Sequence, residues 1–160
     1  MPTRKLRDYL DQHDIQYVTI SHSPAYTAQR IAELTRIPGK ELAKTVIVKV
    51  DDKFAMAVLP ASRRVNLEHL KEAIGADEVT LSSETEFNEL FPDCEVGAMP
   101  PFGNLYDMGV YVAEQLTEDE EIAFNAGSHS ELVKMSYNDY ANLVTPQVVA
   151  LTSARRRLAV

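Results

Sequence analysis

The stretch "AKTVIVKV" (residues 43–50), followed by "KFAMAVLP" (residues 53–60), decides the fold of this chain. Both runs are rich in apolar and β-branched residues, and only Asp51 and Asp52 separate them. Two such runs joined by a short polar turn predict a β-hairpin. Because both runs are apolar over most of their length, we expect two central strands of a sheet.

Helical and strand patterns flank this hairpin on both sides without strict alternation. We expect a helix over residues 3–13 and another over residues 66–75. A third should begin at a cap on Thr27 and end at Pro38-Gly39. Two more should follow the capping box of Ser83 and Glu86 and the cap at Ser136. We expect further strands over residues 16–22, 105–106, 110–113, 121–125, 131–135 and 147–151. This mixture predicts an α+β fold, in which helices flank a mixed, largely antiparallel sheet.

Length and composition predict one domain over residues 1–152, with a basic, flexible tail over residues 153–160. The formal net charge of −8 opposes long contacts along DNA or RNA, although it allows a local phosphate site. No run approaches the roughly 20 apolar residues that span a bilayer. With Cys94 as the single cysteine, we expect a cytoplasmic protein without a metal or another cofactor and without a membrane partner.

Lys44 stands where a loop enters the first hairpin strand. A lysine at a strand entrance is usually solvated, and that interpretation applies here when Lys44 is taken alone. The alternative is that Lys44 lies at the mouth of a pocket, where its charge meets a phosphate or a developing oxyanion. The chain lacks a nucleophile elbow, a phosphate loop and a zinc helix, so no residue stands out as a nucleophile.

Two turns are also unusual. "GAMPPFG" (residues 97–103) combines glycines, which permit close approach, with prolines, which fix φ, and such a loop can hold peptide N–H groups ready for a carbonyl. "NAGSH" (residues 125–129) places a serine and a histidine on a bend. Each has a plainer interpretation, the first as a rigid connector and the second as a hairpin turn.

In this order, "LAKTVIVKV", "GAMPPFG" and "AFNAGSHSELVKM" resemble the YbaK and prolyl-tRNA synthetase-associated editing-domain family. The likeness extends from the Thr27 helix to the Ser136 helix. It implies a freestanding domain that hydrolyses the ester between a wrong amino acid and the 3′ end of a tRNA, expected here to be tRNA-Pro carrying a small amino acid. The expected partners are the acceptor end of the aminoacyl-tRNA and, as a second candidate, prolyl-tRNA synthetase.

The resemblance also implies roles for individual residues. Lys44 and the Gly97 backbone would be catalytic, with Pro101 keeping the loop in shape and the tRNA 2′-hydroxyl assisting the water. Residues expected around the amino acid are His22, Thr45, Gly127, Ser128 and His129. Residues expected to contact tRNA phosphates are Lys40, Arg63 and Arg64.

Two other functions stay open at this point. The chain could be a non-catalytic module that binds tRNA or a synthetase, or a hydrolase of small-molecule esters. An aminoacyl ester is already activated, so its hydrolysis needs a placed water and oxyanion stabilisation without a protein nucleophile. This chemistry favours the deacylase over the other two.

Overall fold

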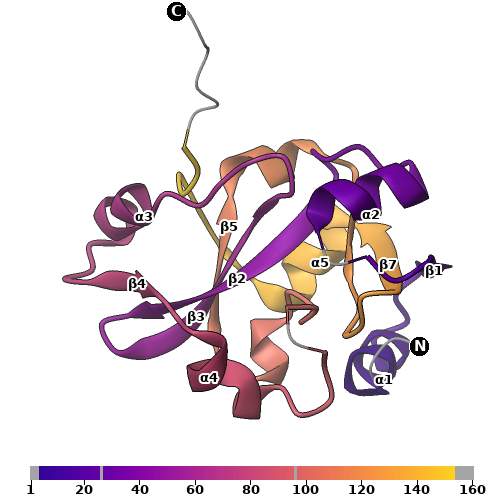
Figure 1. Ribbon diagram of the computed structural model, residues 1–160, viewed down its shortest axis with the longest axis horizontal. Helices are drawn as coiled ribbons and strands as arrows, with labels where there is room; N and C mark the ends of the chain where they lie inside the picture. The colour runs from indigo at the N-terminus through magenta and orange to yellow at the C-terminus, as the bar shows by residue number, and fades with distance from the viewer. Residues whose placement is uncertain (1–3, 26, 96, 154–160) are drawn as a thin grey trace, which may run out of the picture.

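The computed structural model describes residues 4–25, 27–95 and 97–153. In this part of the chain, strands form one mixed sheet in the order β1-β7-β6-β2-β3-β5-β8, and β4 pairs with β2 beside this path. The strands are β1 (Tyr17–Ser21), β2 (Leu42–Val50), β3 (Lys53–Pro60), β4 (Val79–Leu81), β5 (Gly109–Ala113), β6 (Glu121–Asn125), β7 (Glu131–Ser136) and β8 (Gln147–Val149). Figure 1 shows β2 crossing the middle of the molecule. The predicted α+β class is confirmed.

The predicted hairpin and the central position of its strands are confirmed. β2 and β3 pair antiparallel from Ala43 opposite Pro60 to Val50 opposite Lys53. Asp51 and Asp52 both have positive φ, at 49° and 69°, the conformation that a two-residue type I′ turn requires. Aspartate tolerates this region better than most residues because its short side chain bonds locally.

The α-helices are α1 (Arg4–Gln12), α2 (Ala28–Thr35), α3 (Leu67–Ile74), α4 (Glu84–Phe87) and α5 (Tyr137–Val144). The caps expected at Thr27, Ser83 and Ser136 are confirmed, since each side chain accepts the N–H three residues later. Short 3₁₀ helices follow at Asn88–Leu90, Gly103–Leu105 and Glu114–Glu118. A side-chain acceptor at the cap satisfies a donor that the helix itself leaves unpaired.

The sheet buries apolar side chains on both faces. On one face, residues of α1 and α5 pack against alternate strand positions such as Ile47 and Met56. On the other face, α3 covers Val48 and its neighbours, while α2 covers Leu42. Because neighbouring residues of a strand point to opposite faces, Lys44 lies on the α2 face and Lys49 on the α1 and α5 face.

The structure differs from the expectations at three places. Residues 105–106 are no strand, because the chain turns as a 3₁₀ helix whose Gly103 packs against Met108: an added Cβ would lie 2.6 Å from the Met108 oxygen. α2 ends at Thr35, before Pro38, because Arg36 takes a left-handed conformation. The three-residue strand β4 was not expected, since three residues show too little periodicity.

Within the described residues, none of the helices has the length and apolar character needed to cross a membrane. The expected tail lies almost entirely outside the described residues, because residues 154–160 are not among them. The division into a domain of residues 1–152 and a tail therefore stays a prediction.

Candidate functional site

A cavity of about 200 Å³ opens beside the start of β2. Three of the residues expected at the site, Lys44, Thr45 and Gly97, line it together. Its other lining residues are Ile31 of α2, Leu42 and Ala43 of β2, and Asn125 at the end of β6. The fold therefore joins a strand entrance and a loop that are far apart in the sequence.

The parallel pairing of β2 and β6 explains why Lys44 and Asn125 share this cavity. Leu42 pairs with Ala123 and Ala43 with Phe124. Continuing this register by one residue places Lys44 beside Asn125, and paired residues of neighbouring strands point to the same face. Both side chains consequently emerge on the face that α2 covers, at the point where the two strands separate.

Lys44 is half-buried, and no carboxylate within the described residues forms an ion pair with it. Burial lowers the pKa of its ammonium from the ordinary value, and the nearby positive charge of Arg64 lowers it further. A partly desolvated cation acts more strongly on a negative charge than a solvated one does. Lys44 is thus a positive charge beside a small cavity, and no counter-charge pairs with it in the described part of the chain.

Gly97 supplies the loop wall of the cavity, with φ at +83°. A left-handed conformation of this kind suits glycine and strains other residues. An added Cβ would lie 3.6 Å from His129 Cε1, which is ordinary contact, so the backbone conformation rather than crowding selects glycine. In the described part of the chain the Gly97 N–H donates to no acceptor, and it can therefore donate to a ligand.

Hydrogen bonds tie the Gly97 loop to the turn at Gly127. The Glu95 N–H donates to the Gly127 oxygen at 2.7 Å, and the Gly127 N–H donates to the Ala98 oxygen at 2.8 Å. A Glu95 carboxylate oxygen also accepts the His129 N–H at 2.6 Å. Three hydrogen bonds thus join the two turns that the sequence singles out beside the cavity.

Pro101 lies buried behind this loop. Its carbonyl oxygen accepts the hydroxyl of Tyr140 at 2.7 Å, and Tyr140 is fully buried in α5. Proline lacks an N–H and has a fixed φ, so this one bond anchors a segment with little freedom of its own. The expected role in holding the loop has a physical basis in this contact.

His22 and Ser128 lie beside the turn and are not among the residues that line the cavity. The His22 N–H donates to the Ser130 oxygen at 2.8 Å, and His22 Nδ1 contacts the Ser23 oxygen at 2.7 Å. The Ser128 hydroxyl is 3.4 Å from the Ser130 hydroxyl. Like Gly127 and His129, both residues therefore lie outside the lining of the cavity.

The basic residues expected to contact tRNA lie on two adjacent loops. An added Cβ on Gly39, next to Lys40, would lie 3.3 Å from Ser62 Cβ, next to Arg63, so the loops pack together. The side chain of Lys40 is exposed and that of Arg63 is partly exposed. Arg64 is close enough to Lys44 to affect its pKa, so positive charge surrounds one side of the cavity.

Asn125, Ile31 and Glu95 belong to this region but were not expected there. Ile31 lies on the buried face of α2 and packs with Leu42 of β2. Asn125 directly precedes the "AGSH" turn, yet only the pairing of β2 with β6 brings it to Lys44. Sequence proximity to the turn was the one signal that could have pointed to Asn125.

Cys94 is a packing residue, partly buried against the apolar core. Burial raises the pKa of its thiol to about 11, with the neighbouring Asp93 carboxylate acting in the same direction. The thiolate is the reactive form of cysteine. Cys94 is therefore unsuited to act as a nucleophile at neutral pH.

The family model "Aminoacyl-tRNA editing domain" matches residues 22–143. The chain is 28% identical over 152 residues to the multifunctional Ser/Thr-tRNA deacylase ProXp-y of Escherichia coli K12, covering 91% of this chain and 90% of that protein. It is 32% identical over 82 residues to the proline–tRNA ligase of Bacillus cytotoxicus, covering 51% of this chain and 14% of the ligase.

Solved structures share the fold. The crystal structure of a hypothetical protein superposes with a TM-score of 0.84 at 21% identity, covering 94% of this chain and 100% of that one. A structure assigned as a candidate trans-editing enzyme for prolyl tRNA synthetase superposes with a TM-score of 0.80 at 18% identity, covering 94% and 96%. At these identities the likeness establishes the fold alone.

Proposed function

The chain belongs to the aminoacyl-tRNA editing domain family and is an aminoacyl-tRNA deacylase, and from this premise we propose that it removes a small non-cognate amino acid from tRNA. The family resemblance and the enzyme class expected from the sequence are both confirmed. The proposal concerns the finer points: which residues act, which amino acid is removed and which tRNA carries it.

One observation carries the proposal: Lys44 and Gly97 line the same small cavity, and each brings a hydrogen-bond donor to it, the Lys44 ammonium and the Gly97 N–H. Neither has a bonding partner among the described residues. Attack of water on an ester carbonyl creates a negative oxygen, and preorganised donors at that oxygen lower the barrier. A cation and a free peptide N–H are the groups that this step requires.

In the proposed reaction, water attacks the ester carbonyl and forms a C–O bond. The Gly97 N–H donates to the resulting oxyanion, and the Lys44 ammonium offsets the negative charge of this oxyanion and of the neighbouring nucleotide phosphate. The 2′-hydroxyl of the terminal ribose orients the water. The bond from the carbonyl carbon to the 3′ oxygen then breaks, and a proton from the water passes to that oxygen, releasing the free amino acid and an intact tRNA.

Size restricts the amino acid. The cavity of about 200 Å³ is smaller than the roughly 300–1,000 Å³ of pockets for drug-sized ligands. It accommodates a small amino-acid side chain and leaves the nucleotide outside. Thr45 borders this cavity, while Gly127, Ser128, His129 and His22 form the supporting turn beside it.

Charge directs the tRNA to one side of the site. Lys40, Arg63 and Arg64 are our candidates for phosphate contacts, because they lie on the loops beside Lys44. With a net charge of −8 on the chain, these contacts would be few. Binding is therefore expected to be modest and to weaken as salt is raised.

We take tRNA-Pro as the first tRNA to test, because the chain shares a segment with proline–tRNA ligases. Prolyl-tRNA synthetase is the corresponding candidate partner. The name of the E. coli relative refers instead to Ser/Thr-tRNA, so serine and threonine join alanine, cysteine and 2-aminobutyrate in the panel of attached amino acids.

The test measures release of radiolabelled amino acid from each mischarged tRNA, with correctly charged prolyl-tRNA as the control. Rapid release from at least one mischarged tRNA, with prolyl-tRNA spared, is the expected result. Binding of tRNA without any turnover would support the non-catalytic module. Turnover of simple esters without a tRNA requirement would support the small-molecule hydrolase.

A further inference from the structure

Asn125 has a feature that the catalytic proposal does not use. Its carboxamide oxygen is buried and makes no hydrogen bond. Among the residues that line the Lys44 cavity, it is the one described side chain with a buried polar atom in this condition. A buried acceptor without a donor costs roughly 1–3 kcal/mol of stability, and an acceptor of this kind on a residue that lines a cavity can bond a water or a ligand there.

From this we infer that Asn125 is a specificity-determining residue that accepts a hydrogen bond from the side-chain hydroxyl of the attached amino acid, which makes serine and threonine esters the preferred substrate class. The inference rests on the proposed function, since it presumes that the cavity holds the amino acid. The last torsion of asparagine is broad, so a small rotation turns the oxygen toward the ligand.

Three donors of an aminoacyl-tRNA could reach this oxygen: the side-chain hydroxyl, the α-ammonium and the ribose 2′-hydroxyl. An ammonium is disfavoured here because Lys44 lines the same cavity and Arg64 is close to it. The cavity volume of about 200 Å³ leaves the ribose outside. A neutral hydroxyl on a short side chain meets both conditions.

Thr45 borders the same cavity, but it directly follows Lys44 on β2, so its side chain points to the opposite face of the sheet from Lys44 and Asn125. The hydroxyl-binding role therefore falls to Asn125. The apolar residues Ile31, Leu42 and Ala43 fill the rest of the wall. The cavity therefore resembles a pocket for two or three carbons with one hydroxyl, and serine and threonine fit that description.

Serine and 2-aminobutyrate form the sharpest pair for a test, because a methyl group replaces the hydroxyl at nearly constant volume. We would prepare adenosine analogues that carry each amino acid through a 3′-amide, which resists hydrolysis, and measure their affinities by calorimetry. Wild-type protein should bind the seryl analogue at least about tenfold more tightly, since a site with a buried polar group rejects a ligand that leaves it unpaired. Asn125→Leu should reduce the ratio to near one.

Asn138→Leu is the matched control, because the same chemical change there falls on an exposed position of α5 and should leave the ratio intact. Asn125→Leu removes an unpaired acceptor, so it should melt no lower than wild type. Should it fail to fold, Asn125→Ala and the wild-type ratio provide the same test.

Equal wild-type affinities for the two analogues would overturn the inference, as would a preference that survives in Asn125→Leu or the binding of neither analogue. An equal loss of both ligands in Asn125→Leu would also overturn it, by assigning Asn125 to the ammonium or the ribose. Because the analogues are not hydrolysed, the result is separate from turnover. Wild-type protein that binds them selectively but deacylates no tRNA would refute the proposed function alone.

Discussion

Lys44 and Lys49 stand on the same central strand, yet their surroundings differ. Lys44 faces a cavity, lies near a second cation and has no ion pair among the described residues. Lys49, on the opposite face, forms an ion pair with Glu86 of α4 and lies 5.5 Å from the centre of the Phe54 ring. The alternation of side chains along β2 therefore places the ion-paired Lys49 on one face and Lys44, which can bind a ligand, on the other.

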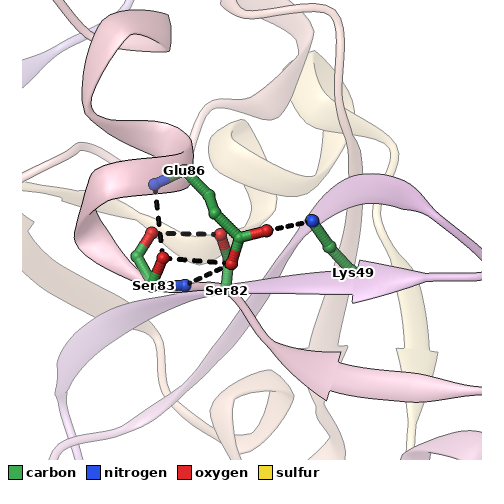
Figure 2. A network of polar contacts seen from close by, with 4 residues as sticks. All are labelled: Lys49, Ser82, Ser83 and Glu86. Atoms are coloured by element: carbon green, nitrogen blue, oxygen red, sulfur yellow. Dashed lines mark hydrogen bonds and ion pairs between the residues drawn. The ribbon is translucent and has the colours of Figure 1, made fainter.

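Figure 2 shows the network of polar contacts to which Lys49 belongs. One carboxylate oxygen of Glu86 accepts a hydrogen bond from the Lys49 ammonium. The other oxygen accepts hydrogen bonds from the N–H and the hydroxyl of Ser83. The same residues form the capping box of α4. A satisfied network of this kind stabilises structure, whereas an unpaired, half-buried cation is a typical functional feature.

The largest effect should come from removing the unpaired lysine. Lys44→Ala is expected to slow deacylation by about 10²–10³-fold, the cost of losing one preorganised oxyanion stabiliser. Lys49→Ala, on the same strand, should change the rate by less than about threefold. Single-turnover release of amino acid from mischarged tRNA measures both variants.

The fold of the lysine variants serves as the control. Burial lowers the pKa of Lys44, so its charged form is less favoured in the folded protein than in the unfolded chain. Below that lowered pKa the charge costs stability, and the cost disappears as pH rises through it. Lys44→Met should thus melt no lower than wild type at pH 7. Equal losses of turnover in the Lys44 and Lys49 variants would erase the contrast between the two lysines.

Gly97 offers the second test of the available site. Gly97→Val places a β-branched side chain at a φ of +83°, which costs about 1–2 kcal/mol of stability and should shift the backbone N–H of this cavity-lining residue. We expect roughly a 100-fold slower turnover, as for small misplacements of catalytic groups. Gly109→Val is the control, because nothing lies within 4 Å of an added Cβ there. Wild-type turnover in Gly97→Val would reduce this loop to a connector.

How much of this could be predicted depends on how local each feature is. The hairpin turn and the caps at Thr27, Ser83 and Ser136 involve neighbouring residues, so their patterns are visible in the sequence. The parallel pairing of β2 with β6 joins distant segments, and it alone places Asn125 beside Lys44. The family resemblance suggested Lys44 and Gly97 as partners but provided no register for Asn125.

The partner of Lys49 shows the same limit. The sequence predicts the Ser83–Glu86 capping box, yet it does not indicate that Glu86 also meets a lysine from β2. That meeting depends on where α4 packs against the sheet. Side chains that act across elements are therefore the part of the site, and of the scaffold, that sequence patterns leave open.

A third, smaller effect links the two faces of the sheet. The Tyr140 hydroxyl, buried on the α5 side, holds the Pro101 oxygen of the loop that continues to Gly97. Tyr140→Phe leaves that oxygen without its donor and should lower the free energy of unfolding by about 1–3 kcal/mol. Urea denaturation measures this loss, and Tyr111→Phe, whose hydroxyl has no bond within the described residues, is the matched control. Similar midpoints for the two variants would mean that the loop does not depend on this bond.

The smallest effect should come from the paired lysine, as a change in pH dependence. The Lys49 ammonium, together with the Ser83 N–H and hydroxyl, lowers the pKa of Glu86 to about 2. Because this pKa is lower in the folded protein than in the unfolded chain, the network stabilises the fold above the unfolded value of roughly 4.3. That stability is lost as pH falls from there toward 2. Urea midpoints followed over this range should fall less steeply for Glu86→Gln and Lys49→Met than for wild type, while Lys44→Met keeps the wild-type slope. A wild-type slope in all three variants would show that the solvated ion pair does not contribute to the free energy of unfolding. Lys49 would then differ from Lys44 in its position in the fold but not in its contribution to stability.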